Sequence, residues 1–256
     1  MVVADLHVHT TNSDGELTLS RLPAAAERAG VSAVAVTDHD RIHPELPTPV
    51  VILDGVTVIH GIELRVETDT ERVDLLGYGV TPTDELEALV EGLQRNRIER
   101  GRRIIENVEA RLGVELPVEP REGLGRPHIA RAIDEASEYS YEEAFDELIG
   151  DDGPCFVARD IPSFEEGLSV LQEACGLVSL AHPFRYEDPE AALELCADLD
   201  AVEAHYAYGR EVDRRPIERA IEAYDLLVTG GSDAHDDELG KAGLDRSDYR
   251  RFRAAL

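Results

Sequence analysis

The sequence has almost no lysine, no tryptophan and few cysteines. Lys241 is the only lysine, and Cys155, Cys175 and Cys196 form no CxxC pair. Cysteines spaced in this way are typical of small buried side chains in a reducing compartment. No run of eighteen apolar residues is present, and the N-terminus lacks the basic flank and apolar core of a signal peptide. We therefore expect a cytoplasmic protein without a membrane contact.

Basic residues are scarce relative to acidic ones. The chain has 54 Asp and Glu against 25 Lys and Arg, a formal net charge of -29. The acids are spread along the whole chain, and a hydrophobic content of 43% argues against disorder. At about 1 M salt the Debye length falls to about 3 Å, so repulsion between surface charges is screened. The charge therefore predicts adaptation to a high-salt cytoplasm and argues against binding of long duplex nucleic acid.

Short apolar runs alternate with helical patterns in the first third and the last third of the chain. A helix is expected over 17–30, ending at Gly30. Strands that alternate with helices indicate a parallel sheet covered by helices, with functional sites at the carboxyl ends of the strands. The expected strands lie within residues 2–8, 31–40, 56–64, 72–80, 176–183, 199–206 and 224–235.

The middle of the chain has a different pattern. From Thr83 to about Gly113 the apolar residues follow helical spacing, as at Leu86, Leu89 and Leu93. We predict that residues 82–160 form a mostly helical insert or cap. Residues 1–81 and 161–256 would then form the α/β core.

Histidines and carboxylates follow several of the apolar runs. Parallel strands bring their carboxyl ends to one face, so these side chains are expected to share one cleft. His7 and His9 lie two residues apart and would point the same way from a strand, while Asp14 lies in the loop beyond. Unpaired imidazoles and carboxylates are costly to bury together, whereas a metal ion binds both. The pattern therefore predicts a multinuclear metal centre rather than a structural polar network.

Six segments resemble the successive motifs of the polymerase and histidinol phosphatase (PHP) superfamily. They are DLHVHTTNSDG, VTDHD, GIEL, GRPHIARAI, LAHP and GGSDAH, and they span nearly the whole chain. The segment from GRPHIARAI to AFDELIG, residues 125–150, is similar to the branch of nucleoside 3′,5′-bisphosphate phosphatases and 5′-3′ exoribonucleases, and less so to histidinol phosphatases. The resemblance implies a distorted (β/α)7 TIM-like barrel with the helical insert.

The resemblance also implies a ligand set for two or three divalent ions. The first ion would take His7, His9, Glu63 and Asp233. Glu63 would bridge to a second ion that also takes His182, and the third would take Asp14, His39 and His235. Relatives usually have a histidine where this chain has Asp74, which would either ligate through oxygen and favour Mn over Zn or Fe, or be a solvated acid beside a weak site.

Arginines and a histidine outside this set are candidate substrate contacts. By resemblance, Arg126 would hold a phosphate and His128 would protonate the leaving group, with Arg185 as a further phosphate contact. The alternative for Arg126 is a salt bridge at the start of a helix. A second basic run is more typical of ion pairs on a solvated helix than of substrate steering. It consists of Arg95, Arg97, Arg100, Arg102 and Arg103.

These observations predict a metal-dependent phosphoesterase acting on a small phosphorylated substrate. A nucleotide is expected, either a nucleoside 3′,5′-bisphosphate or an RNA 5′ end. Two alternatives remain open at this point. One is hydrolysis of histidinol phosphate, and the other is a metal-binding PHP module without turnover, which the unusual Asp74 favours. The sequence does not indicate an oligomeric state.

Overall fold

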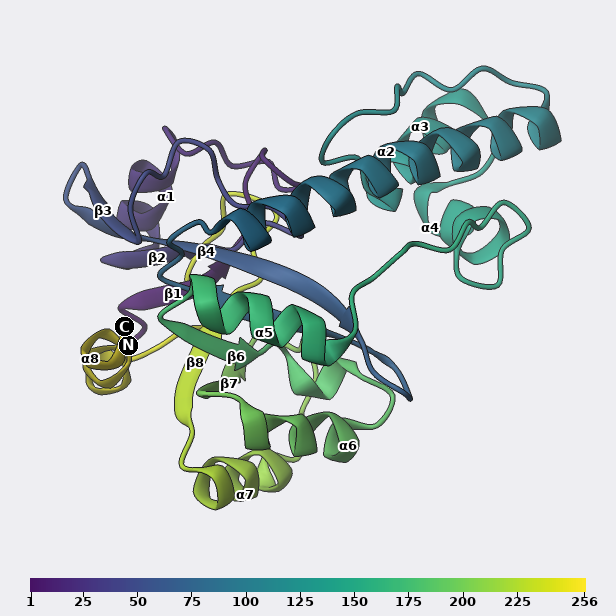
Figure 1. Cartoon of the computed structure of the whole chain (residues 1–256). Coiled ribbons are helices and arrows are strands. Elements are labelled where there is room, and N and C mark those ends of the chain that lie inside the picture. Colours follow the sequence, from purple (N-terminus) through teal and green to yellow (C-terminus); the bar gives the residue numbers. More distant parts are fainter. The chain divides into compact units, whose positions relative to one another are not determined.

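Seven strands form a nearly closed, barrel-like sheet in the first of two units into which the chain divides (Figure 1). The computed structural model describes residues 1–256, and the first unit comprises Met1–Ala88 and Ile161–Leu256. The strand order is β1-β2-β4-β5-β6-β7-β8, and β3 (Val50–Leu53) pairs only with β4. The predicted barrel is therefore confirmed. The seven strands are β1 (Ala4–Val8), β2 (Ala33–Val36), β4 (Val56–Glu67), β5 (Arg72–Tyr78), β6 (Leu177–Leu180), β7 (Ala201–Tyr206) and β8 (Leu227–Gly231).

The first and last strands meet, which brings the two ends of the sheet together. Val8 forms a parallel bridge to Ala234, and the His9 backbone N–H donates to the Ala234 carbonyl at 2.9 Å. Every residue of β1 and of β2 is buried. Strands covered on both faces are typical of the inside of an α/β fold, which agrees with the apolar run AVAV of β2, whereas β1 (ADLHV) also buries Asp5 and His7.

The expectation of an all-parallel sheet is wrong at β5. This strand runs antiparallel to both β4 and β6, while the other strands on the path are parallel. Only Thr68–Glu71 separate β4 from β5, and Glu67 pairs directly with Arg72. Such a short connection permits only a hairpin, because a parallel crossover requires a dozen or more residues. The direction of β5 places its amino end beside the carboxyl ends of the other strands.

Helices of the first unit pack against this sheet. Helix α1 ends at Gly30, whose φ of 71° is the left-handed conformation that caps helices, as the sequence predicts. Helix α5 begins after Ser163, whose side chain accepts from the Glu166 N–H. The helices are α1 (Leu22–Ala29), α5 (Phe164–Ala174), α6 (Pro189–Glu194), α7 (Arg215–Tyr224) and α8 (Arg246–Ala255), with 3₁₀ turns at Pro183–Arg185 and Leu195–Asp198.

The second unit, Leu89–Asp160, is helical and has its own core. Helix α2 (Asp84–Leu112) begins in the first unit and supplies Ile104 and Val108 to that core. The other helices are α3 (Arg126–Ala136), α4 (Tyr141–Ala144) and a π turn at Phe145–Ile149. None of the helices in the chain combines the length and apolar character that a membrane span requires.

Candidate metal centre

Strand ends from across the sheet position the predicted ligands of the first unit. His7 lies on β1 and His9 directly after it, while His39 follows β2 and forms a bridge to Glu63 of β4. His182 follows β6, and Asp233 and His235 follow β8. Asp74 lies near the start of β5 rather than at its end, and it reaches the same region only because that strand is antiparallel. His182 and Asp233 have positive φ values of 27° and 52°, a backbone strain that is typical of functional sites.

Glu63 lies at the centre of the cluster. Its carboxylate is 2.7 Å from His39 Nδ1, 3.0 Å from His182 Nε2, 3.3 Å from His9 Nε2 and 3.4 Å from His7 Nε2. The side chain is almost completely buried. One carboxylate therefore faces four imidazoles from three different parts of the chain, which is the environment expected of a bridging ligand.

Asp233 and Asp14 extend the cluster on the side of His9. Asp233 Oδ1 is 3.0 Å from His9 Nε2, and Asp14 Oδ1 is 3.4 Å from His235 Nε2. The rings of His9 and His235 are stacked with 4.2 Å between their centroids. Asp14 is also 4.0 Å from His39 Nε2. The loop carboxylate thus joins the strand-end histidines, as the sequence predicts.

The nine predicted ligands fit divalent metal ions. They form four groups whose potential ligand atoms lie within 4.8 Å of one another. Two buried ring nitrogens in these groups, His9 Nδ1 and His182 Nδ1, have no hydrogen-bond partner. Buried polar atoms without a partner are rare, and imidazole and carboxylate donors suit Zn, Mn and Fe. The groups are His9–Asp14–His39–His235, His7–His9–Glu63, His7–His182–Asp233 and Glu63–Asp74–His182.

The electrostatics of the cluster favour bound cations. Burial alone would lower the pKa of His39, but Glu63 and Asp14 outweigh it and raise that pKa to about 9. Burial is likewise outweighed at His7, where Glu203, Glu63 and Asp233 raise the pKa well above its usual value. Burial and the neighbouring His39 instead lower the pKa of His9. The carboxylates therefore stabilise positive charge here, whether a proton or a metal ion supplies it.

Glu203 orients two of the predicted ligands. Its Oε1 is 3.1 Å from His7 Nδ1, and its Oε2 accepts the His182 backbone N–H at 2.8 Å. A proton on Nδ1 leaves the lone pair of His7 Nε2 directed at Glu63 and Asp233, the tautomer that a metal ligand needs. Glu203 lies on β7 and is fully buried, and these two contacts make it a positioning residue for the cluster.

We expect Glu203→Gln to weaken metal binding about 10- to 100-fold, because the amide lacks the charge that fixes the His7 tautomer. Titration of metal-free protein with Mn²⁺ against a chelating indicator measures this affinity. Glu190→Gln is the matched control, since Glu190 is an exposed acid paired with Arg219. Unchanged affinity in Glu203→Gln would contradict the orienting role.

Asp38 and Asp5 hold the loops that carry predicted ligands. Asp38 accepts hydrogen bonds from the Thr10 N–H and the Ser13 hydroxyl, both at 2.7 Å, and so fixes the turn before Asp14. Asp5 accepts from the Ser232 N–H at 2.9 Å and from the Ser232 hydroxyl, next to Asp233. Both carboxylates are fully buried in these contacts. They are positioning residues. In the sequence, an acid within a buried strand or directly after one indicates such a residue.

Arg185 lies beside the cluster. Its Nη1 donates to Asp233 Oδ2 at 2.9 Å, and the Tyr206 hydroxyl donates to the same oxygen at 2.8 Å. About half of the Arg185 side chain is exposed. Arg185 is therefore positioned to contact an anion bound at the cluster. Tyr206 was not singled out in the sequence.

Other histidines of the first unit do not join the cluster. The ring of His205 faces Arg214 and Asp248, and it is partly exposed. His60 Nε2 accepts the His43 backbone N–H at 3.1 Å. These contacts are structural, and none of the four candidate metal groups contains His43, His60 or His205.

Arg126 and His128 lie at the start of α3, in the second unit. Arg126 Nη1 contacts Asp151 at 2.5 Å and the Ile149 carbonyl at 3.2 Å, and its guanidinium lies 5.7 Å from the centre of the Phe156 ring. His128 Nδ1 accepts the Gly125 N–H. The helix-entry salt bridge that was the alternative for Arg126 is thus present. The role of Arg126 in holding a phosphate stays a prediction.

The basic run on α2 is divided between two environments. Arg95 and Arg102 pair with Glu91 and Glu99 at the surface, as expected for a solvated helix. Arg97 is buried instead, and Arg100 lies 5.8 Å from the centre of the Phe156 ring.

Arg100 also lies within the electrostatic range of other guanidinium groups of the second unit. Burial, together with Arg126, Arg159 and Arg97, lowers its pKa to about 9. The second unit therefore gathers positive charge at one place in an otherwise acidic chain.

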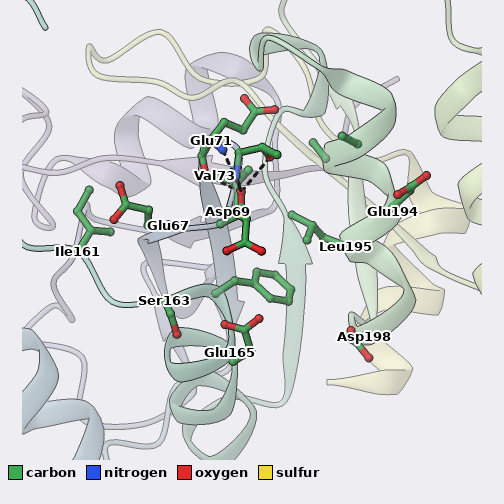
Figure 2. Close-up of a pocket in the computed structure, with 15 residues that line it drawn as sticks. Glu67, Asp69, Glu71, Val73, Ile161, Ser163, Glu165, Glu194, Leu195 and Asp198 are labelled. Atoms are coloured by element: carbon green, nitrogen blue, oxygen red, sulfur yellow. Dashed lines mark hydrogen bonds between the residues drawn. The ribbon is translucent and has the colours of Figure 1, made fainter.

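A separate hollow of the first unit lies beside the β4–β5 turn (Figure 2). Acidic and apolar side chains line it in equal number, and none of the predicted ligands lines it. The Thr68 hydroxyl and Glu71 close the turn through hydrogen bonds within the wall. Acidic surface is abundant throughout this chain, so we assign no ligand to this hollow.

Comparison with known proteins identifies relatives along almost the whole chain. The family model for the PHP domain matches residues 5–207. The chain is 26% identical to a 3′,5′-nucleoside bisphosphate phosphatase of Chromobacterium violaceum, over 96% of this chain and 90% of that protein. It is 28% identical to the 5′-3′ exoribonuclease Rnm of Escherichia coli, over 94% of this chain and 89% of the relative.

A solved structure from Bifidobacterium adolescentis, assigned as a metal-dependent phosphoesterase, superimposes with a TM-score of 0.82. It is 25% identical in sequence, and the match covers 98% of this chain and 96% of that one. The sequence match and the structural match thus cover the same barrel and insert.

Proposed function

The chain belongs to the PHP domain family and is a metal-dependent phosphoesterase, and from that premise we propose that its substrate is a phosphorylated nucleotide. A nucleoside 3′,5′-bisphosphate or the 5′ end of an RNA is our first choice. The relatives named for these activities match the chain over nearly its full length. Within this proposal, residues 1–81 and 161–256 form the barrel core, and residues 82–160 form a helical insert or cap.

The observation that carries the nucleotide proposal is the group of arginines in the second unit. Arg97, Arg100 and Arg126 share one helical unit of a chain whose formal net charge is -29, and two of them lie over the Phe156 ring. Guanidinium groups bind phosphate through paired N–H donors, and aromatic rings stack on nucleobases. Hydrolysis at the metal centre needs only one phosphoryl group. The arginines of the second unit therefore favour a substrate that carries further negative charge.

The proposed chemistry divides the work between the metal ions and the side chains of this chain. His7, His9, Glu63 and Asp233 would hold one ion, and Asp14, His39 and His235 another, with Glu63 also facing His182 and Asp74. Divalent ions bound there would lower the pKa of water and neutralise negative charge on the phosphoryl oxygens. Arg126 and Arg185 hold phosphate oxygens by charge-assisted hydrogen bonds, and His128 gives a proton to the departing oxygen.

We expect phosphate release from a nucleoside 3′,5′-bisphosphate, or nucleotide release from a 5′-phosphorylated RNA, to exceed phosphate release from histidinol phosphate by at least about tenfold in kcat/KM. Assays with added Mn²⁺ at high salt measure this, since the charge of the chain favours a salt-rich cytoplasm. Equal or faster release from histidinol phosphate would overturn the substrate assignment.

Arg126→Gln should lower kcat/KM for the nucleotide about 10- to 100-fold, the effect of one lost hydrogen bond to a charged group. The Arg102→Gln variant is the control, because Arg102 pairs with Glu99 on the exposed face of α2.

A further inference from the structure

Arg65 and Asp74 form a two-point ion pair within the sheet. Arg65 Nε donates to Asp74 Oδ1 at 2.7 Å, and Nη2 donates to Oδ2 at 2.6 Å. The two residues are direct cross-strand partners on β4 and β5, so the register of the hairpin holds them opposite each other. Asp74 is 1% exposed, whereas 37% of the Arg65 side chain is exposed. The guanidinium thus reaches from solvent to a buried carboxylate.

The same carboxylate belongs to one of the groups that could hold a metal ion. Glu63, Asp74 and His182 form this group, with His182 Nε2 at 3.0 Å from Glu63 and 3.7 Å from Asp74 Oδ2. Each Asp74 oxygen already accepts one guanidinium N–H. A divalent ion on Asp74 would therefore share its ligand with a fixed positive charge and be repelled by it. The other three groups contain no arginine-paired carboxylate except Asp233, which Arg185 contacts with one nitrogen.

The ion pair is not a requirement of the hairpin itself. Two residues along the same ladder, Arg72 pairs with Glu67 through a single contact of 3.3 Å, and both side chains are exposed. A surface pair of that kind contributes little, and a buried pair must offset the desolvation of its charges. The two-point pair to a buried carboxylate thus occurs at the ladder position beside Glu63 and His182, and not at the exposed Arg72–Glu67 position.

We infer that Arg65 takes the place of a metal ion at the Glu63–Asp74–His182 group. The chain then holds two ions tightly, through the other groups, and a third only weakly. The Arg65 guanidinium supplies the positive charge at this end of the cluster and, being partly exposed, offers its remaining N–H groups to an anionic substrate. This inference rests on the proposed function, which makes the cluster a metal centre.

The test is the number and affinity of bound Mn²⁺ ions. Metal-free protein is titrated with Mn²⁺ by calorimetry, and the tightly held ions are counted by mass spectrometry after gel filtration. The wild-type chain should retain two ions and release a third. Arg65→Gln should bind the third at least about tenfold more tightly, because the repelling charge is gone. Arg72→Gln is the matched control and should behave as the wild type.

Asp74→Asn provides a second variant, which should keep both tight ions because neither depends on Asp74. Three equally tight ions in the wild type, no gain in Arg65→Gln, or loss of a tight ion in Asp74→Asn would each overturn the inference. The absence of any tightly bound ion in the wild type would instead overturn the metal centre itself.

Discussion

Replacing His9 with glutamine should lower phosphate release about a thousandfold and remove most of the tightly bound metal. His9 belongs to two of the four candidate groups, and its Nε2 lies 3.0 Å from Asp233 and 3.3 Å from Glu63. Its Nδ1 has no hydrogen-bond partner, although the side chain is fully buried. Loss of an ion removes several kcal/mol of transition-state stabilisation, and about 4 kcal/mol corresponds to about a thousandfold in rate.

His205→Gln is the control for this substitution, because His205 lies on β7 of the same barrel but outside the cluster. Circular dichroism and a thermal unfolding curve establish that both variants are folded. Activity and metal content are then compared at equal protein concentration. A folded His9→Gln protein that retains both its metal and its turnover would refute the role of His9.

Gly231→Ala should destabilise the protein by about 3 kcal/mol or more, which is more than a hundredfold in the ratio of folded to unfolded chains. Gly231 ends β8 opposite β1, and a Cβ there would lie 2.3 Å from the His7 backbone nitrogen and 2.3 Å from His7 Cβ. Backbone atoms cannot rotate away as a side chain can. The methyl group would therefore separate the two strands that close the barrel.

Urea denaturation gives the free energy of unfolding for this variant. Gly92→Ala is the comparison, because a Cβ at Gly92 of α2 meets only the end of the Arg95 side chain. Alanine is the better helix former, so that change should stabilise the chain by up to about 1 kcal/mol. A Gly231→Ala protein as stable as the wild type would show that β1 and β8 can move apart without loss.

Much of the candidate site follows from local patterns in the sequence. His7 and His9 are two residues apart on and after β1, and in the structure both face Glu63. Apolar runs followed by polar residues predicted the strands and the end of the sheet where the site lies. The role of these side chains as metal ligands stays a prediction until ions are measured.

The direction of β5 was predicted wrongly, and the reason is informative. An apolar run has the same appearance in a parallel and in an antiparallel strand, so periodicity does not give direction. The four-residue connection Thr68–Glu71 does contain that information, since only a hairpin fits it. Counting outward from this turn places Arg65 opposite Asp74 and would have revealed their pair.

The basic run on α2 shows a second limit. Charges three and four residues apart predict surface pairs, and Arg95 and Arg102 form them. Arg97 is buried, and Arg100 approaches Phe156, a residue far along the chain. The charge pattern of a helix does not predict which of its faces a distant loop will cover.

By itself, then, the sequence determined an α/β sheet through its local periodicity, and its short motifs resembled the PHP superfamily, which implied the barrel and the residue types of the centre. Only the tertiary structure decided which carboxylates face imidazoles and which face arginines. Asp74 and Glu63 are both buried acids near strand ends, yet one pairs with Arg65 and the other with four histidines. Strand direction and register set that difference, since they determine which side chains from distant parts of the chain come within a few ångströms of each other.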